Sequence, residues 1–172
     1  DIDDFEGAPG YHAGATDAAT FGKALEVLAS DDAPQFVFDV TMQNHGGYDA
    51  GTVPEEDVVW YTPAGVEDEG LLTQLNTYLA CIEASDRDLE AFIAQLRSLD
   101  RPVVLVYFGD HQPSVSTGLN DTLYPGEEPA VHAQRQYQTP YIVWANYDVA
   151  GCDQLSAWRE TDPALLAAQT LH

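Results

Sequence analysis

Basic side chains are scarce in this sequence. Among 172 residues there are 6 lysines and arginines against 29 aspartates and glutamates, which gives a formal net charge of -23. A chain with this charge repels the phosphate backbone of nucleic acids, and it has no stripe of basic residues that could displace counterions. The charge also disfavours an anionic membrane surface. We therefore expect no nucleic-acid partner, and a solvated acidic surface that could also gather cations.

Cysteines are few, and long apolar runs are absent. The two cysteines, Cys81 and Cys152, match no metal-binding or redox spacing, so the sequence leaves open whether they pair. No stretch approaches the roughly 18 apolar residues of a membrane span, and the first residues have no signal-peptide pattern. A hydrophobic content of 45% is enough for one domain with a core. We expect a single domain over residues 1–172, cut from a longer chain because it begins with polar residues.

Strand and helix patterns are strong in the rest of the chain. Segments rich in β-branched and aromatic residues predict strands at 36–42, 103–108 and 139–146. Apolar residues at helical spacing predict helices at 17–30, with Asp17 as the N-cap, at 69–99, as one helix or as two with a break near Ser85, and at 163–171. Strands separated by helices predict an α/β fold, with a mainly parallel sheet flanked by helices.

Polar residues follow each predicted strand directly. His45 lies in the Gly-rich stretch after the first, Asp110 and His111 come after the second, and Asn146 ends the third. Because parallel strands share one carboxyl edge, where open α/β sheets bind their ligands, we expect these residues on one rim. The long polar segment 112–139 between the last two strands is typical of a functional loop or lid.

Asp110 and His111 offer an oxygen and a nitrogen ligand, a combination common at divalent metal sites. Two ligands do not complete such a site, and the alternative is an Asp that caps a turn beside an ordinary loop His. His45 could donate to an anionic substrate oxygen, or it could simply be hydrogen-bonded in its turn. A Ser-His-Asp triad with Ser114 or Ser116 is disfavoured because the sequence has no Gly-x-Ser-x-Gly motif.

Three blocks of sequence resemble a known family. Residues 36–48, 104–114 and 137–148 are similar to sulfatase-type enzymes of the alkaline phosphatase superfamily, with the closest likeness to lipoteichoic acid synthases and related phosphoglycerol transferases. The helical stretch 78–96 resembles the helix that precedes the Gly-Asp-His strand of that family. Residues 14–17 resemble the segment before its His-bearing strand. The likeness covers nearly the whole chain in the same order.

The resemblance implies an alkaline-phosphatase-like fold that is incomplete here, and it implies roles for three residues. Asp110 and His111 match the ligands of a catalytic divalent metal, most often manganese, with magnesium, calcium or zinc as alternatives. His45 matches the residue that faces the phosphate or glycerol group. The implied substrate is an anionic phosphate or sulfate ester, possibly lipid-linked. The implied parent protein is membrane-anchored, with its catalytic domain at the extracellular face of the cell membrane.

The chain departs from the family pattern in lacking a nucleophile. In the family, a threonine or formylglycine nucleophile and an acidic metal ligand lie upstream of these blocks, and Thr41 lies inside a strand where the family has no nucleophile. The resemblance therefore implies the carboxyl-terminal part of a catalytic domain, inactive by itself. It leaves open phosphoglycerol transfer and ester hydrolysis. A non-catalytic acidic binding domain that keeps the sulfatase-like fold is the alternative.

Overall fold

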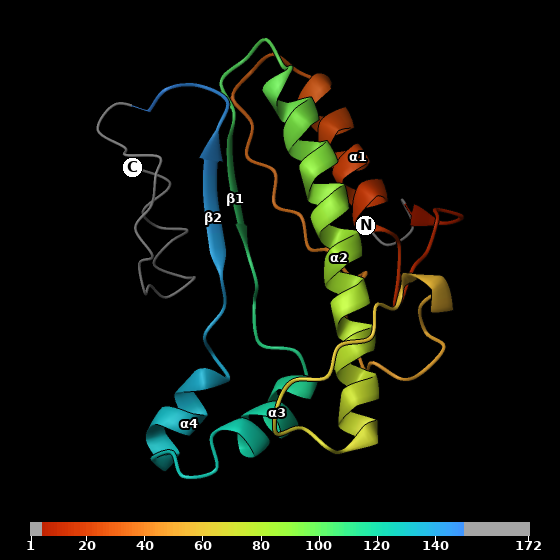
Figure 1. Ribbon diagram of the computed structural model, residues 1–172. Helices are drawn as coiled ribbons and strands as arrows, with labels where there is room; N and C mark the ends of the chain where they lie inside the picture. The colour runs from red at the N-terminus through yellow and green to blue at the C-terminus, as the bar shows by residue number, and fades with distance from the viewer. Residues whose placement is uncertain (1–4, 150–172) are drawn as a thin grey trace.

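Two long helices lie side by side against a pair of strands, and two short helices form one end of the molecule (Figure 1). The computed structural model describes residues 5–149. Its elements in chain order are α1 (Asp17–Ala29), the 3-10 helix η2 (Glu55–Asp57), α2 (Glu69–Arg97), β1 (Val104–Phe108), α3 (Val115–Leu123), α4 (Pro129–Arg135) and β2 (Tyr141–Ala145). Cys152 and the helix predicted at 163–171 lie outside the described residues.

Both long helices form where the apolar spacing predicts them, and side chains cap their first turns. In α1 the N-cap is Thr16 rather than Asp17, because the Thr16 side chain accepts a hydrogen bond from the Ala19 N–H. In α2 the Asp68 side chain caps in the same way. Helix α2 continues through Ser85 without a break. The Ser85 hydroxyl has side-chain partners outside the helix, so it does not compete with the helical backbone.

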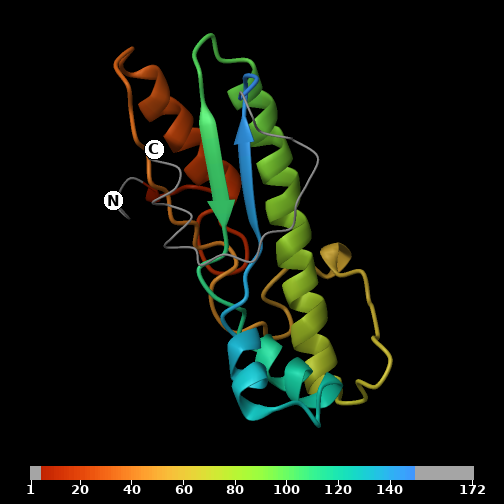
Figure 2. The same cartoon turned by 90° about the vertical axis from the view of Figure 1, so that its left-hand side faces the viewer.

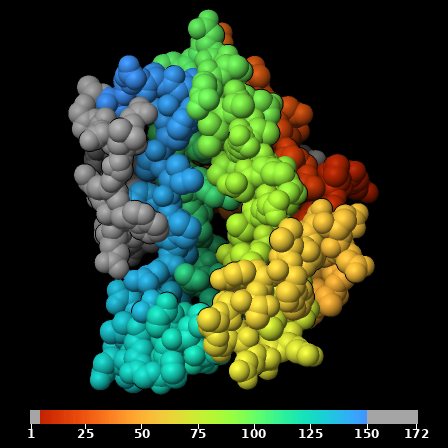
Figure 3. Space-filling view, viewed as in Figure 1, coloured from red at the N-terminus to blue at the C-terminus, as the bar shows by residue number. Residues whose placement is uncertain are grey.

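The two strands pair antiparallel, with Val104 opposite Ala145 and Phe108 opposite Tyr141. The prediction of a mainly parallel sheet is therefore wrong for these two strands. A parallel pair needs a crossover that carries the chain back along the sheet. The segment after β1 instead stays at the end of β1, where α3 contacts α2, and β2 then runs back beside β1 (Figure 1). Figure 3 shows α3 and α4 at the same end of the molecule as the first turns of α2.

The segment predicted as the first strand, residues 36–42, is extended but pairs with no strand in the described part of the chain. Residues 36–41 form no backbone-to-backbone hydrogen bond with any other residue in the described part of the chain. Figures 1 and 2 show this segment running in the same direction as β1, on the side of β1 that faces away from β2. Its backbone is extended like that of a strand, but no described segment is hydrogen-bonded beside it.

Two apolar clusters hold the elements together. One joins the first half of α2 to α3 and to the loop before α2 through Tyr48, Val53, Leu75, Ala80, Cys81 and Val115. The other packs α1 on the second half of α2 through Phe21, Ala24, Leu89, Phe92 and Leu96, and Val37, Leu105, Tyr107 and Trp144 lie against it. The two helices α1 and α2 thus form one layer, and Val37, β1 and β2 pack against it. One face of the strands packs against α1 and α2, where its side chains are half-buried.

Asn146 lies at the start of β1 and not at its carboxyl end, which corrects the prediction that it shares a rim with Asp110 and His111. Because β2 is antiparallel, its last residues return to the beginning of β1. The Asn146 side chain accepts from the Val103 N–H and donates to the carbonyl oxygens of Leu96, Leu99 and Arg101 at 3.2, 3.4 and 2.8 Å. It closes the turn between α2 and β1.

We predict that Asn146→Ala lowers the free energy of unfolding by about 1–3 kcal/mol, because it leaves partly buried backbone groups without a partner. Urea unfolding followed by circular dichroism measures this. Gln134→Ala removes an exposed amide on α4 and should change stability by less than about 0.5 kcal/mol. Equal effects of the two substitutions would contradict the structural role of Asn146.

Candidate functional site

Asp110 and His111 lie together in the turn that follows β1. The His111 Nε2 atom lies 3.5 Å from the Asp110 Oδ2 atom, and the two side chains are 62% and 80% exposed, respectively. The His111 Nδ1 atom lies 2.8 Å from the carbonyl oxygen of Gln112. Since a carbonyl oxygen can only accept, Nδ1 carries the proton in this contact and Nε2 keeps a lone pair. The Nε2 atom and the Asp110 Oδ2 atom are close enough to each other to bind one cation together.

The described residues supply only these two donors at this point. No group of three or more His, Cys, Asp or Glu side chains in residues 5–149 could hold a metal ion. Zinc and similar ions bind at least three protein ligands in most sites. The donor pair therefore fits a divalent metal in kind and in geometry, but further ligands would have to come from outside the described residues.

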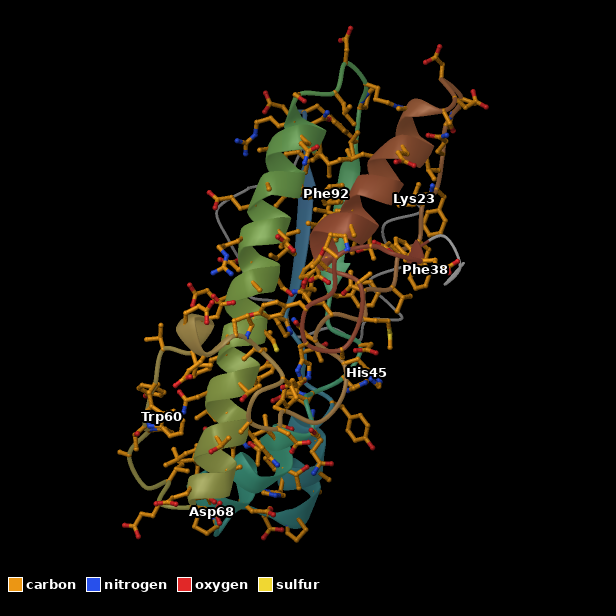
Figure 4. All side chains as sticks on the ribbon, turned by 90° about the vertical axis from the view of Figure 1, so that its right-hand side faces the viewer. Lys23, Phe38, His45, Trp60, Asp68 and Phe92 are labelled. Atoms are coloured by element: carbon orange, nitrogen blue, oxygen red, sulfur yellow. The ribbon has the colours of Figure 1, made fainter. Side chains whose placement is uncertain are left out.

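His45 lies in the loop that follows the extended segment. Its backbone N–H donates to the Met42 carbonyl oxygen at 3.1 Å, and Gly46 follows with a φ of 110°, a conformation that favours glycine. The side chain is exposed (Figure 4) and makes no hydrogen bond or ion pair within the described part of the chain. The structure thus brings Asp110 and His111 together, and no contact joins His45 to either.

Behind His45 lies a buried polar network that the sequence analysis missed. The Ser85 hydroxyl donates to the Asp17 carboxylate at 2.5 Å and accepts from the side-chain amides of Gln43 and Asn44 at 3.2 and 2.7 Å. The Gln43 side-chain oxygen in turn accepts from the Asp17 backbone N–H at 3.1 Å. Asp17, Gln43 and Ser85 are each at most 4% exposed. The polar Gln-Asn pair directly before His45 was the signal in the sequence.

The network fixes the base of the His45 loop to both long helices. Asp17 is the first residue of α1 and Ser85 lies in the middle of α2, while Gln43 and Asn44 immediately precede His45. Burial raises the pKa of the Asp17 carboxyl, although the hydrogen bond from Ser85 opposes this effect. A buried carboxyl, the buried amide of Gln43 and the half-buried amide of Asn44 therefore share one serine hydroxyl.

A second cluster of titratable side chains joins α3 and α4. His132 lies 2.9 Å from Asp121 and 3.5 Å from Glu127. Arg135 binds both carboxylate oxygens of Glu127 at 2.7 to 2.9 Å, and this contact lowers the Glu127 pKa. Because Arg135 already neutralises Glu127, the cluster is suited to holding α4 in place and not to binding a cation. It provides a matched His control for the Asp110–His111 pair.

Comparisons with known proteins identify the class of this chain. The sulfatase family matches residues 2–164, and the chain belongs to that family. Membership implies an alkaline-phosphatase-like α/β fold, and enzymes of this family generally use a divalent metal. No solved structure matches the chain. No helix in the described residues has the length and apolar character needed to cross a membrane.

Among curated proteins, the chain is similar to two from Rhizobium meliloti (strain 1021) and one from Haemophilus influenzae. It is 29% identical over 124 residues to a putative cyclic beta-1,2-glucan modification protein, covering 66% of this chain and 18% of that protein. It is 36% identical over 104 residues to the capsular polysaccharide biosynthesis protein RkpI, covering 60% and 16%. An uncharacterized Haemophilus protein is 32% identical over 125 residues, covering 72% and 21%. The chain thus spans about a fifth of each relative's length.

We predict that Ser85→Ala lowers the free energy of unfolding by about 1–3 kcal/mol, because the carboxylate and the two amides lose their common partner. Chemical denaturation measures this. Ser98→Ala, which removes an exposed hydroxyl at the end of α2, is the matched control and should cost less. The same cost for both substitutions would show that the buried network contributes no particular stability.

Asp17 also gives the chain a pH-dependent stability. The pKa of Asp17 in the folded chain lies above its ordinary value of 3.8. At pH values between 3.8 and this raised pKa, the folded chain therefore binds more protons than the unfolded chain. Stability from Asp17 is therefore present below pH 3.8 and is lost as the pH rises through the raised pKa.

Asp17→Asn should remove this loss, so the stability difference between variant and parent should shift in favour of the variant as the pH rises across that window. Denaturation at a series of pH values measures the difference. Asp100→Asn, at an exposed carboxyl, is the control. A pH-independent difference for Asp17→Asn would contradict the raised pKa.

Proposed function

We propose that this chain is the carboxyl-terminal part of a catalytic domain that transfers phosphoglycerol groups to a glycan of the cell envelope. The observation that carries the proposal is the pairing of Asp110 with the His111 Nε2 atom directly after β1. Membership of the sulfatase family supports an enzyme of the sulfatase or transferase type. Hydrolysis of phosphate or sulfate esters would use the same donor pair, so the acceptor determines which of the two reactions occurs.

Asp110 and His111 would hold the divalent metal, and manganese is the proposed ion. When bound, the metal stabilises charge on the transferring group and activates a nucleophile. The proton on His111 Nδ1, donated to Gln112, keeps Nε2 directed toward the metal position beside Asp110. The remaining ligands belong to residues outside this chain in the proposal.

His45 would donate a hydrogen bond to an oxygen of the phosphate group. Its exposed side chain is not engaged by other described residues, and its backbone is held by the network of Gln43 and Asn44 on Ser85. A hydrogen-bond donor whose backbone is fixed and whose side chain is exposed can stabilise an anionic group without a large rearrangement of the protein. The net charge of -23 would repel an anionic substrate, so the bound cation must dominate the field at the site.

The nucleophile would also come from outside this chain. Thr41 is half-buried beside the buried Asp17 carboxylate, whose pKa it helps to lower, which supports excluding it as the nucleophile. The isolated chain should therefore have no turnover. Two relatives are named for a cyclic glucan and for a capsular polysaccharide, and these names support an envelope glycan as acceptor. A lipid-linked donor and a membrane-anchored, extracellular enzyme are part of the proposal.

The test uses the full polypeptide that contains this chain, with manganese, phosphatidylglycerol vesicles and a β-glucan acceptor. We predict phosphoglycerol transfer that falls roughly a thousandfold in His111→Ala and in Asp110→Asn, because a metal ligand supports several kcal/mol of transition-state stabilisation. His132→Ala should retain activity. Turnover of aryl sulfate without transfer would instead identify a hydrolase, and no turnover of any ester would favour the non-catalytic acidic binding domain.

Manganese titration of the isolated chain gives an independent result. We predict weak binding, with a dissociation constant near or above about 1 mM, because two protein ligands leave most of the ion hydrated. Isothermal titration calorimetry measures the affinity, and His111→Ala should weaken it further. Micromolar binding by the isolated chain would mean that it contains a complete metal site, which the proposal denies.

A further inference from the structure

Asp110 and His111 each use one polar atom to hold the turn and direct the other one at their neighbour. The Asp110 Oδ1 atom accepts a hydrogen bond from the His111 backbone N–H at 2.9 Å, and the His111 Nδ1 atom donates to the Gln112 carbonyl oxygen at 2.8 Å. The two other atoms, Asp110 Oδ2 and His111 Nε2, lie 3.5 Å apart. The direction in which the pair presents these two atoms therefore depends on the backbone of residues 110–112.

Both ends of this turn are held by the fold. Upstream of the pair, the Gly109 N–H donates to the Pro140 carbonyl oxygen at 3.2 Å, just before β2. A Cβ atom at Gly109 would lie 3.3 Å from the Cβ atom of Thr139, so glycine allows the two segments to approach closely. Downstream of the pair, Val115 is 2% exposed and belongs to the apolar cluster on the first half of α2. The residues between these two points need a further contact to fix their peptide groups.

Gln112 makes this contact. Its side-chain amide donates to the Gln138 carbonyl oxygen, while its own carbonyl oxygen accepts the hydrogen bond from His111 Nδ1. The residue is half-buried, although the two side chains before it are exposed. Without the amide contact, the peptide group that follows Gln112 would be free to rotate, and its carbonyl oxygen would turn away from the ring. One residue therefore holds the ring of His111 and is itself held by the segment before β2.

The hydrogen bond to Nδ1 matters because it decides where the ring carries its proton. A neutral histidine that binds a metal through Nε2 must carry its proton on Nδ1. A free imidazole ring in water prefers the opposite tautomer, with the proton on Nε2. The Gln112 carbonyl oxygen opposes this preference, because it can accept only from a protonated Nδ1. Partners that orient a ligand in this way commonly change metal affinity by about 10–100-fold.

We propose that Gln112 is a positioning residue for the Asp110–His111 pair. Its carbonyl oxygen selects the tautomer of His111, and its amide, bound to the Gln138 carbonyl oxygen, keeps that carbonyl oxygen in place. The segment between α4 and β2 thus supports the donor pair, although it is distant in the sequence. The inference rests on the proposed function for the metal, whereas the tautomer is a property of the chain without a metal.

Manganese affinity of the full polypeptide tests the proposal with Gln112→Met, which keeps the length of the side chain and removes its N–H donors. We expect manganese to bind about 10–100-fold more weakly, while the melting temperature of the metal-free polypeptide changes little. Saturating manganese should restore phosphoglycerol transfer in Gln112→Met, because both ligands are still present, but not in His111→Ala. Gln134→Met, at an exposed amide on α4, is the matched control and should change neither affinity nor transfer.

Three results would overturn the proposal in a polypeptide that binds manganese. The first is an affinity of Gln112→Met equal to that of Gln134→Met. The second is a loss of transfer that saturating manganese does not restore. The third is a loss of affinity that is matched by a lower melting temperature, because Gln112 would then contribute only to folding.

The tautomer provides a measurement that needs neither metal nor turnover. Nitrogen NMR spectroscopy of the metal-free polypeptide with isotope-labelled histidine, assigned by comparison with His111→Ala, distinguishes a protonated Nδ1 from a protonated Nε2. At about pH 8, where imidazole rings are neutral, we expect the Nδ1–H form in the parent and in Gln134→Met, and a shift toward the Nε2–H form in Gln112→Met. The Nε2–H form in the parent, or no shift in Gln112→Met, would overturn the inference. The expected shift without manganese binding or ester turnover would refute the proposed function and leave the role of Gln112 intact.

Discussion

The hydroxyl of Ser85 connects three segments that are far apart in the sequence. It donates to the Asp17 carboxylate at the start of α1 and accepts from Gln43 and Asn44 beside His45. All of these groups lie in a largely buried position, where an unpaired polar group costs more than it would at the surface. The packing of α1 on α2, the path of the extended segment and the placement of the His45 loop therefore depend on one another.

The Ser85 network fixes the His45 loop beside a solvent-exposed surface of the molecule. The backbone beside His45 is fixed by the network while its side chain is exposed, and Asp110 and His111 are the two donors of the proposed metal site. The segment that leads to His45 exposes the apolar residues Phe36, Phe38, Val40 and Met42, and residues 36–41 form no backbone-to-backbone hydrogen bond with other described residues. In the proposed function, metal ligands from outside this chain would complete the site at this surface.

The sequence predicted the features that depend on local patterns. Helices α1 and α2 formed where apolar spacing placed them, and β1 followed from its run of β-branched and aromatic residues. The direction of β2 was predicted wrongly, because strand direction depends on the path of the connection and not on the strand residues; Asn146 was misplaced for that reason. Residues 36–42 are extended, as their β-branched and aromatic residues predict, but they pair with no described strand. A strand pattern does not indicate which segment lies beside it, so this could not be predicted. The Ser85 network was missed because hydrogen bonds between distant segments have no periodic signal.

In the proposed function, Asp110 and His111 bind a catalytic metal whose other ligands lie outside this chain. A crystal structure of the full polypeptide with manganese, located by its anomalous scattering, tests this most directly. We predict one ion about 2.0–2.3 Å from Asp110 Oδ2 and His111 Nε2, with further ligands contributed from outside the chain. An ion bound elsewhere, or a site in which these two side chains face only solvent, would contradict it.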